Sequence, residues 1–377
     1  MGNKVIVFGA GKIGRGFIGH LCSKSNRDIV FVDKDEGLIS ALKKSKTYQI
    51  HILNAKKDIV EINPQHCYAI NDPSWLDVFA TAEVCFTAVF GNNLEDLAAS
   101  IAKGIVHRME QGNDGSMNII TCENLSHAAA VLKQHVANKM HNDASRQYLE
   151  AKVGFVEGIM LKTCLSDPDH PVNVMVQDFN ELPCDLDGFK GKIPDITGLK
   201  PLPEFRNQLV RKIYTYNCIN AVMTYMGAAK GYSYLSEAAA DPEIYQMAAT
   251  AGGEASKALL AEFGFDPAEQ QAWVQSALDK FADPAIPDPI LRNAADPVRK
   301  LRNDDRLIGP ANLALKHHVV PRAIIAGVLA ALQYEDEEIS MKTTRALHGV
   351  GWMLQQYCNL DTNDLLFQMI VLESQRK

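Results

Sequence analysis

The sequence predicts an α/β domain built on a doubly wound parallel sheet, followed by an all-α domain. In the first half of the chain, short apolar segments alternate with helical patterns. Glycine and proline cluster between residues 188 and 203, and beyond them the apolar spacing changes from two to about 3.6 residues. The length of 377 residues also exceeds what one hydrophobic core usually serves.

The first expected strand and the turn after it are the most informative segment. Residues 5–8 are β-type and apolar, and Gly9-Ala10-Gly11-Lys12-Ile13-Gly14 follows directly. This is G-x-G-x-x-G between a strand and a helix, the context in which the motif binds a dinucleotide. Gly9 permits the tight turn, Gly11 lets a pyrophosphate approach the backbone, and Gly14 lets helix and strand pack closely. The alternative is a nucleotide-free turn that uses glycine only for packing.

A second apolar strand, over residues 28–32, ends at Asp33. This is about the spacing expected of the acid that binds a ribose 2′-hydroxyl. A carboxylate repels a 2′-phosphate, so NAD is expected rather than NADP, although Lys34 beside it weakens this preference. The expected cofactor-binding residues are Phe8, Gly9, Ala10, Gly11, Lys12, Ile13, Gly14, Arg15, Gly16 and Asp33.

The expected elements define two domains. The first half has strand patterns at 4–8, 28–32, 83–89, 117–122 and 152–156, a hairpin-type insertion at 47–60 and a further strand at 172–176. The second half has helical windows at 204–230, 243–264, 267–281, 310–333 and 338–358. We therefore expect a Rossmann-type NAD-binding domain over residues 1–195 and a helical substrate and catalytic domain over residues 196–377.

Composition excludes several other classes of protein. The chain is 47% hydrophobic and 22% charged, and its net charge of −7 gives no electrostatic reason to expect nucleic acid or an anionic membrane as partner. No segment is long and apolar enough to span a bilayer, and the chain enters a strand with no signal peptide. The 8 cysteines are scattered without a C-x-x-C motif, which is typical of a reduced, cytoplasmic protein.

Polar residues interrupt the otherwise apolar helix expected from residue 204. At about 100° per residue, Asn220 falls near 80° and Asn217 near 140° from Lys212, so the three share one side of the helix. Burial lowers the pKa of a lysine and makes it a general base near neutral pH, and amides beside it can hold a developing oxyanion. The alternative is a lysine that reaches the surface, with asparagines that cap neighbouring helices.

Asn124 is a further candidate for the active site. It follows the apolar strand over residues 118–121, at the carboxyl end of a strand in a doubly wound sheet, where ligands bind. Its amide can donate to a substrate oxygen or to the nicotinamide ribose. The alternative is that Asn124 caps a helix beginning at Leu125.

Several segments together resemble a known family. They are residues 8–19, 47–51, 101–106, 110–113 and 122–124, Lys212 with Asn217, and residues 299–301 and 305–308. In these motifs the chain resembles the polyol-specific long-chain dehydrogenases, the mannitol dehydrogenase family, and within it the mannitol-1-phosphate 5-dehydrogenases. The resemblance implies metal-independent hydride transfer with NAD, Lys212 as general base, and Asn124 and Asn217 as oxyanion donors, with Asn220 as a further candidate.

The chain departs from the family pattern at expected substrate contacts. Asn220 stands where the family has a histidine, and an amide cannot carry a proton near pH 7. Leu161 stands in place of an acid, and Lys162 replaces an arginine without its bidentate fork. The expected partner is a polyol or sugar phosphate, and the oligomeric state stays open. The rival functions are a dehydrogenase of a sugar acid such as a hexuronate and a non-catalytic NAD(H)-binding protein.

Basic residues of the second half could bind a metal or a phosphate group, or could form surface ion pairs. His317 and His318 point about 100° apart and have no acid or cysteine at metal-ligand spacing, so no metal site is expected. The candidates for a phosphate contact, with surface ion pairs as the alternative, are Arg299, Lys300, Arg306, Lys316 and Arg322.

The cofactor assignment can be tested at two residues. Gly11→Ala is expected to weaken NAD binding because its methyl group occupies the space of the pyrophosphate. Asp33→Ala is expected to weaken the binding of NAD far more than that of NADP, because only the ribose 2′-hydroxyl uses the carboxylate. Calorimetric titration measures both effects, and unchanged NAD affinity in both variants would remove the site.

Overall fold

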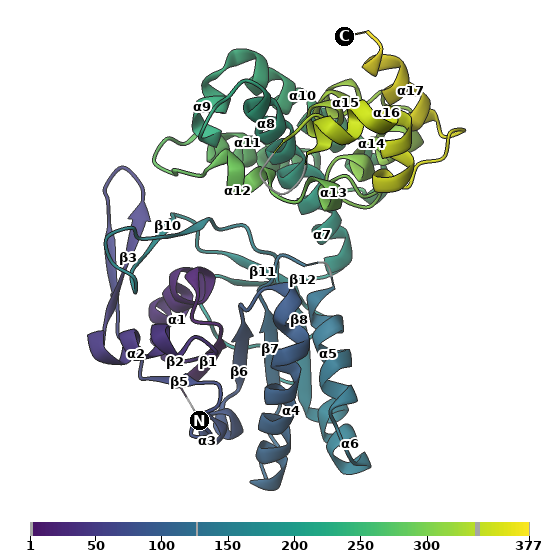
Figure 1. Ribbon diagram of the computed structural model, residues 1–377. Helices are drawn as coiled ribbons and strands as arrows, with labels where there is room; N and C mark the ends of the chain where they lie inside the picture. Colours follow the sequence, from purple (N-terminus) through teal and green to yellow (C-terminus); the bar gives the residue numbers. More distant parts are fainter. Residues whose placement is uncertain (1–2, 126, 336–339, 377) are drawn as a thin grey trace. The chain divides into compact units, whose positions relative to one another are not determined.

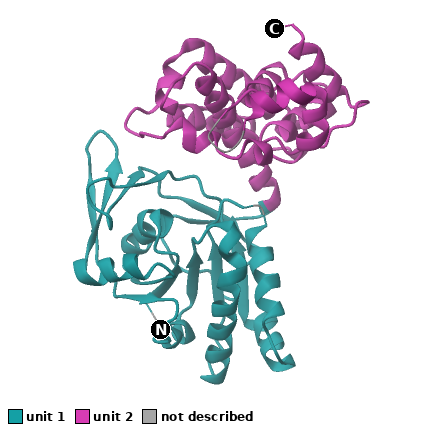
Figure 2. Ribbon diagram, in the orientation of Figure 1, with its two compact units in different colours: residues 1–205 teal, residues 206–377 magenta. Residues whose placement is uncertain are grey.

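The computed structural model describes residues 3–125, 127–335 and 340–376, and divides into the units Met1–Phe205 and Arg206–Lys377 (Figure 2). The first unit contains a six-stranded sheet, ordered β5-β2-β1-β6-β7-β8, in which every pair of neighbours is parallel. Its strands are β1 (Lys4–Phe8), β2 (Asp28–Asp33), β5 (His66–Ala69), β6 (Val84–Thr87), β7 (Met117–Thr121) and β8 (Val153–Glu157). From β1 the chain adds strands first toward one edge of the sheet (β2, β5) and then, starting with β6, toward the other. This change of side between β1 and β6 confirms the doubly wound fold.

Helices cover both faces of this sheet (Figure 1). One face carries α3 (Trp75–Thr81), α4 (Leu94–Glu110) and α5 (Ala128–Asn138), with α6 (Asp143–Lys152) and the short η2 (Gly91–Asn93) beside them. The other carries η1 (Gly14–Ile18), α1 (Gly19–Lys24) and α2 (Glu36–Ser45). Alternate residues of β1 enter the two cores: Ile6 and Phe8 face α3 and α4, and Val5 and Val7 face η1 and α1. The nearly continuous apolar strands of the sequence follow from this burial on both faces.

A second sheet packs on η1, the helical segment that follows the glycine motif. Its order is β4-β3-β10-β9, formed by β4 (Ile59–Ile62), β3 (Tyr48–Leu53), β10 (Val174–Gln177) and β9 (Cys164–Ser166). The expected hairpin is β3 and β4, and the later strand joins β3 in parallel. A methyl group on Gly16 would lie 2.6 Å from Val176 Cγ1, so this glycine lets the sheet pack on η1. A parallel pair, β11 (Leu182–Asp185) and β12 (Leu199–Leu202), lies in the segment rich in glycine and proline.

The described part of the second unit is helical throughout, as the sequence predicts. Its central helix is α8 (Cys218–Ala229), which packs against five other α-helices and is apolar on nearly all sides. Before it come α7 (Phe205–Lys212) and the π-helical η3 (Ile213–Asn217). The others are α9 (Leu235–Ala240), α10 (Pro242–Phe263), α11 (Pro267–Ala282), α12 (Ile290–Ala294), α13 (Pro297–Lys300), α14 (Ile308–Lys316), α15 (Arg322–Ala331), α16 (Met341–Cys358) and α17 (Leu365–Ser374).

Some expected helices differ in their bounds. The expected single helix over residues 310–333 is two helices, α14 and α15. The helix is interrupted between them, and Pro321 directly precedes the second one. Gly349 has a non-helical φ of 78° inside α16, and residues 338 and 339 of the expected window 338–358 lie outside the described residues. Four helices of the second unit were not expected: α9, α12, α13 and α17. The first three have only four to six residues, which carry too little periodicity to detect.

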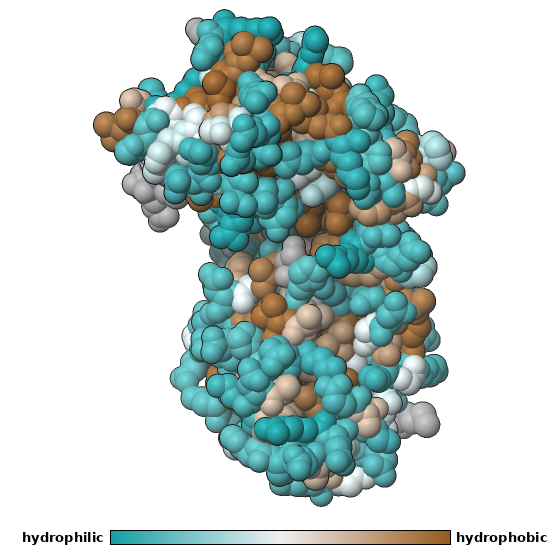
Figure 3. Space-filling model, turned by 90° about the vertical axis from the view of Figure 1, so that its right-hand side faces the viewer, coloured by the Kyte–Doolittle hydropathy of each residue, from teal (hydrophilic) through white to brown (hydrophobic). Residues whose placement is uncertain are grey.

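The surface is mostly hydrophilic on the face drawn in Figure 3, with apolar patches on the second unit. Exposed apolar side chains of the second unit include Leu347 of α16 and Leu365 and Leu372 of α17. Among the helices of the described residues, none is both long enough and apolar enough to cross a membrane.

Arg108, near the end of α4, donates hydrogen bonds to backbone carbonyl groups outside that helix. It is fully buried; Nη1 donates to the carbonyl oxygens of Ala80 at 2.7 Å and Ala82 at 2.9 Å, and Nη2 donates to that of Gly115 at 3.1 Å. Arg108→Leu is expected to lower the free energy of unfolding by about 3 kcal/mol, because these acceptors lose their partner inside the protein.

Urea unfolding measures this loss. The control is Lys133→Met, which removes an exposed ion pair to Glu150 of 2.8 Å and is expected to cost less than about 1 kcal/mol. Equal losses in the two variants would contradict the assignment of Arg108 as a structural residue.

Candidate functional site

Each of the three glycines in the nucleotide-binding turn is needed for a different structural reason. Gly9 has a φ of 96°, and a methyl group there would overlap the carbonyl oxygen of Ala88, which follows β6. A methyl group on Gly14 would overlap the carbonyl oxygen of Gly9. A methyl group on Gly11, in contrast, would meet no atom within 4 Å. Packing therefore requires Gly9 and Gly14, whereas Gly11 leaves open space at the switch point between β1 and β6, as a bound pyrophosphate needs.

Asp33 is held beside this turn by two backbone groups. The N–H of Ala10 donates to Oδ2 at 2.5 Å, and the N–H of Asp35 donates to Oδ1 at 2.9 Å. Each carboxylate oxygen keeps a further lone pair for a hydroxyl group. Lys34 is turned toward η2, where its Nζ donates to Oδ1 of Asn93 at 3.0 Å. The turn and the acid are thus brought together in an arrangement that fits the adenosine ribose of NAD.

Other residues of the predicted cofactor segment serve the core with their side chains. Phe8 is buried against Trp75 and Phe79, and Arg15 is buried with hydrogen bonds to the carbonyl oxygens of Ala10 and Pro171. Gly16 lies beneath the second sheet, whereas Lys12 is exposed at the start of the helix. The helix begins directly after Gly11, where its first N–H groups have no partner within it. Backbone groups rather than these side chains therefore fit a bound phosphate.

Glu123 joins the carboxyl ends of β6 and β7. It is 5% exposed, and its carboxyl group accepts hydrogen bonds from Thr87 Oγ1 at 3.0 Å and from the N–H of Val89 at 3.2 Å. Burial raises the pKa of Glu123 to about 7, against the opposite effect of these hydrogen bonds. Its neighbour Asn124 is exposed in a bend. Helix α5 begins at Ala128, so the alternative that Asn124 caps a helix starting at Leu125 is wrong.

Lys162 lies inside the first unit. It is 6% exposed, and its Nζ is 3.2 Å from His20 Nδ1 and 5.4 Å from the centroid of the Phe17 ring. Burial lowers the pKa of Lys162 to about 8, and burial next to this lysine lowers the pKa of His20 to about 4. Leu161 is buried as well. The Lys162 amine therefore contacts His20 of α1, inside the first unit.

In the second unit, Lys212 is the last residue of α7 and is 7% exposed. Burial, together with the positive charges of Arg306 and Lys280, lowers its pKa to about 7, against the opposite effect of Asp305. This lysine can therefore be neutral near physiological pH and accept a proton. The predicted burial of Lys212 is observed.

The helix after Lys212 is not a regular α-helix. Residues Ile213–Asn217 are π-helical, and a π turn holds more residues than an α turn. The rotation per residue is then smaller than the about 100° assumed from the sequence, so the expected angles of near 80° and 140° do not hold. The smaller rotation moves Asn217 and Asn220 toward the direction of Lys212. Single π turns occur frequently at functional sites.

The polar residues on this segment have different surroundings. Asn217 ends the π turn and is half-buried, and Asn220 is 8% exposed on α8. The Nδ2 of Asn220 donates to Oδ1 of Asn293 at 3.2 Å. Tyr216 faces α11, where its hydroxyl donates to Ser276 Oγ at 2.6 Å. Asn217 and Asn220 thus lie on the π turn and the helix that directly follow the buried lysine.

Four of the basic candidates for a phosphate contact form ion pairs or hydrogen bonds to backbone carbonyl groups. Arg299 pairs with Asp296 at 2.8 Å, and Arg306 pairs with Asp305 at 2.7 Å. Lys316 pairs with Glu262 at 2.7 Å, and His317 lies 2.7 Å from the same carboxyl group.

Lys300 is buried, and its Nζ donates to the carbonyl oxygens of Asn293 and Ala295. Burial lowers its pKa to about 7. Lys300 therefore stabilises the backbone at the end of α12.

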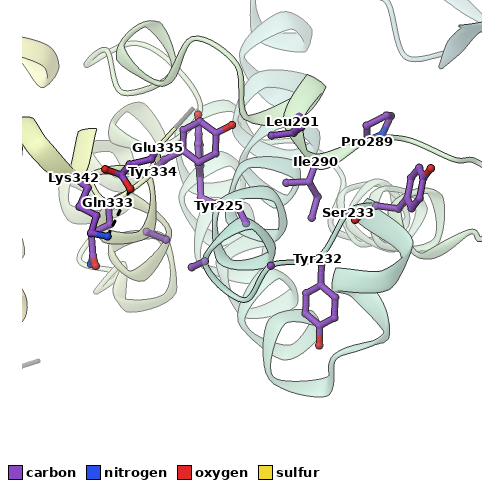
Figure 4. Close-up of a pocket in the computed structure, with 15 residues that line it drawn as sticks. Tyr225, Tyr232, Ser233, Pro289, Ile290, Leu291, Gln333, Tyr334, Glu335 and Lys342 are labelled. Atoms are coloured by element: carbon purple, nitrogen blue, oxygen red, sulfur yellow. Dashed lines mark ion pairs between the residues drawn. The ribbon is translucent and has the colours of Figure 1, made fainter. Parts of the chain in front are cut away.

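A cavity of about 670 Å³ opens at the far end of α8 from Lys212 (Figure 4). Tyr225, Tyr232 and Leu291 line it, and an ion pair of 3.6 Å joins Glu335 and Lys342 at one end. Among the described residues that line this cavity, the predicted catalytic lysine and asparagines are absent.

Two family models match the chain. The mannitol dehydrogenase Rossmann domain matches residues 3–198, and the mannitol dehydrogenase C-terminal domain matches residues 206–347. The chain belongs to the mannitol dehydrogenase family. Its resemblance to that family, drawn from sequence motifs, is thereby confirmed.

Solved structures agree with this family fold. Pseudomonas fluorescens mannitol 2-dehydrogenase, in a ternary complex with NAD and D-mannitol, has a TM-score of 0.74 at 14% identity, over 99% of this chain and 91% of that chain. A D-sorbitol dehydrogenase in substrate-free form has a TM-score of 0.78 at 16% identity, over 98% of this chain and 91% of that chain. At these identities the likeness shows the fold: a Rossmann domain followed by a helical domain.

Sequence reasoning missed three polar residues near the candidate sites. Glu123 lies within the C-E-N motif, but its contact with Thr87 joins two strands that are distant in the chain. Asn293 and Asp288 carry no motif, and 73 residues separate Asn293 from Asn220. A single sequence holds no signal for such a pairing.

Burial of Lys212 predicts a pH-dependent cost to stability. Its folded pKa of about 7 lies below the ordinary 10.5, so the folded state binds the proton less readily than the unfolded chain. The cost is full below pH 7, declines as the pH rises, and vanishes above 10.5. Lys212→Met is therefore expected to gain stability relative to the native protein at pH 6, by up to about 4 kcal/mol, and to lose this gain near pH 10.

Urea unfolding at the two pH values measures this difference. Lys103→Met on the exposed side of α4 is the control and is expected to show no such trend. A relative stability of Lys212→Met that is the same at pH 6 and pH 10 would contradict the lowered pKa.

Proposed function

We propose that this chain is an NAD-dependent dehydrogenase of a polyol or polyol phosphate, which interconverts a secondary alcohol and its ketone. The observation that carries the proposal is the buried Lys212, with a pKa of about 7, in a unit that matches the mannitol dehydrogenase C-terminal domain. The open space over Gly11 and the oriented carboxylate of Asp33 support NAD as the cofactor. The mannitol 2-dehydrogenase of similar fold was solved with NAD and D-mannitol.

In this mechanism the chain's own residues move the proton and hold the oxygen. Neutral Lys212 takes the proton of the reacting hydroxyl group, and the N–H groups of Asn217 stabilise the oxygen as it gains negative charge. Asn124, at the end of β7, donates to the nicotinamide ribose or to the substrate oxygen. Bound NAD supplies the acceptor of the hydride from the alcohol carbon. In the reverse direction, protonated Lys212 returns the proton to the alkoxide.

The reaction is most like the oxidation of mannitol 1-phosphate to fructose 6-phosphate, but three residues differ from the family at expected substrate contacts. They are Asn220, Leu161 and Lys162. The rival substrate, a sugar acid, would need a cation for its carboxylate. The buried contact of Lys162 with His20 speaks against that role for this lysine. The other candidates are arginines of the second unit, and the ion pairs of Arg299 and Arg306 with acids speak against these two, so we favour a polyol substrate.

An NAD(P)H-linked screen over polyols, polyol phosphates and hexuronates tests the proposal. Lys212→Met is expected to reduce turnover of the best substrate by about a hundredfold to ten-thousandfold, the usual contribution of a general base, while NADH binding is kept. For the native protein, kcat/KM for oxidation is expected to rise with pH through about 7 and then level off, because only the neutral amine accepts a proton. Near-native turnover by Lys212→Met would refute the mechanism.

The same screen separates the rival functions. We expect mannitol 1-phosphate to be oxidised weakly or not at all, despite clear NADH binding. Asn220→His alone is expected not to restore its oxidation, because Leu161 still offers no acceptor for a hydroxyl group. Turnover of mannitol 1-phosphate on the order of ten per second, a typical enzyme rate, would instead make it the substrate. NADH binding without turnover of any compound would favour the non-catalytic alternative.

A further inference from the structure

A polar chain with one fixed direction runs from α12 to α8. The Nδ2 of Asn293 donates to Asp288 Oδ1 at 2.7 Å and to the carbonyl oxygen of Pro289 at 3.0 Å. Both partners are acceptors only, so the nitrogen of the Asn293 amide must face them. The oxygen of that amide is consequently turned the other way, toward Asn220.

The direction of the next hydrogen bond follows from the first. Because Asn293 presents an oxygen, which cannot donate, only the nitrogen of Asn220 can face it. The distance from Asn220 Nδ2 to Asn293 Oδ1 is 3.2 Å. If the Asn220 amide flipped, two oxygens would meet in a buried place, which costs about 1–3 kcal/mol for an unsatisfied acceptor. The Asn220 carbonyl oxygen therefore points away from Asn293.

The start of the chain is firmly held. Asp288 is buried, and Arg292 donates to both of its carboxylate oxygens, with Nη2 at 2.6 Å and 2.7 Å. Buried Lys300 donates to the backbone carbonyl oxygen of Asn293 at 2.5 Å. The side chain and the backbone of Asn293 are thus fixed from two sides, so its orientation does not depend on Asn220.

We propose that Asn293, anchored by Asp288, orients the amide of Asn220 so that its carbonyl oxygen is presented to the substrate as a hydrogen-bond acceptor. The inference rests on the proposed function, in which the substrate lies beside Lys212. Asn220 then recognises a substrate hydroxyl group, which donates to its oxygen. Asn293 and Asp288 are positioning residues, and Asn220 contributes specificity for a polyol with a free hydroxyl group near the reacting carbon.

A double-mutant cycle tests the direction of the hydrogen bond without any activity. Asn220→Asp replaces the donor by an acceptor of nearly the same shape. At pH 8 it is expected to lower the unfolding midpoint in the native background, and by clearly less in the Asn293→Leu background, where no opposing oxygen remains. An equal loss in both backgrounds would overturn the proposal. If Asn293→Leu does not fold, Asn293→Ala takes its place in the cycle.

Kinetics test the consequence for the substrate. With the polyol or polyol phosphate of highest rate in the screen, Asn293→Leu is expected to raise KM about tenfold, the equivalent of one hydrogen bond of about 1.4 kcal/mol. A smaller change in kcat and an unchanged Kd for NADH are expected, because proton transfer by Lys212 and the cofactor site are not altered.

Tyr225→Phe is the matched control. Its hydroxyl donates to the carbonyl oxygen of Ala294 at 3.0 Å, so it removes a hydrogen bond between the same two helices without touching the Asn220 amide. Its KM is expected to stay within about twofold of the native value. An equal rise of KM in both variants would show a merely structural role and overturn the proposal. If no compound is turned over, the proposed function fails, while the stability cycle still decides the orientation.

Discussion

The burial of the Lys212 amine is the constraint on which the second unit depends. An ammonium group loses hydration among apolar helices, and here Arg306 and Lys280 add positive charge nearby. The unit accepts this unfavourable placement at the junction of α7 and the π turn that leads into the buried helix α8. The same desolvation that reduces stability brings the pKa into the range where a lysine exchanges protons at neutral pH. Stability and chemistry are therefore opposed at this residue.

The first unit separates the demands of folding from those of cofactor binding within one turn. Gly9 and Gly14 are required because any side chain would meet backbone atoms, whereas Gly11 faces open space. Asp33 is oriented by the N–H of Ala10 from the same turn, so the acid and the turn form one preorganised group. Glu123 joins the ends of the two neighbouring strands behind Asn124. Residues of the fold thus support the groups that we propose contact a ligand.

At position 220 an amide stands where the family resemblance led us to expect a histidine, and the structure gives this amide a defined orientation. An isolated asparagine side chain can present either end to a ligand. The acceptors around Asn293 remove that ambiguity, because each hydrogen bond dictates the direction of the next. Specificity can therefore depend on residues of α12 that never touch the substrate.

The sequence by itself determined five of the six strands of the first sheet, the glycine turn, the place of Asp33 after the second strand, the helical second half and the burial of Lys212. Each depends on local patterns: alternation, glycine spacing and apolar helical faces. Only the tertiary structure decided that the second sheet packs over Gly16, that a π turn follows Lys212, and that Asn293 meets Asn220. These features arise from contacts between residues far apart in the chain, or from packing that overrides the regular helical period, and neither leaves a periodic trace in one sequence.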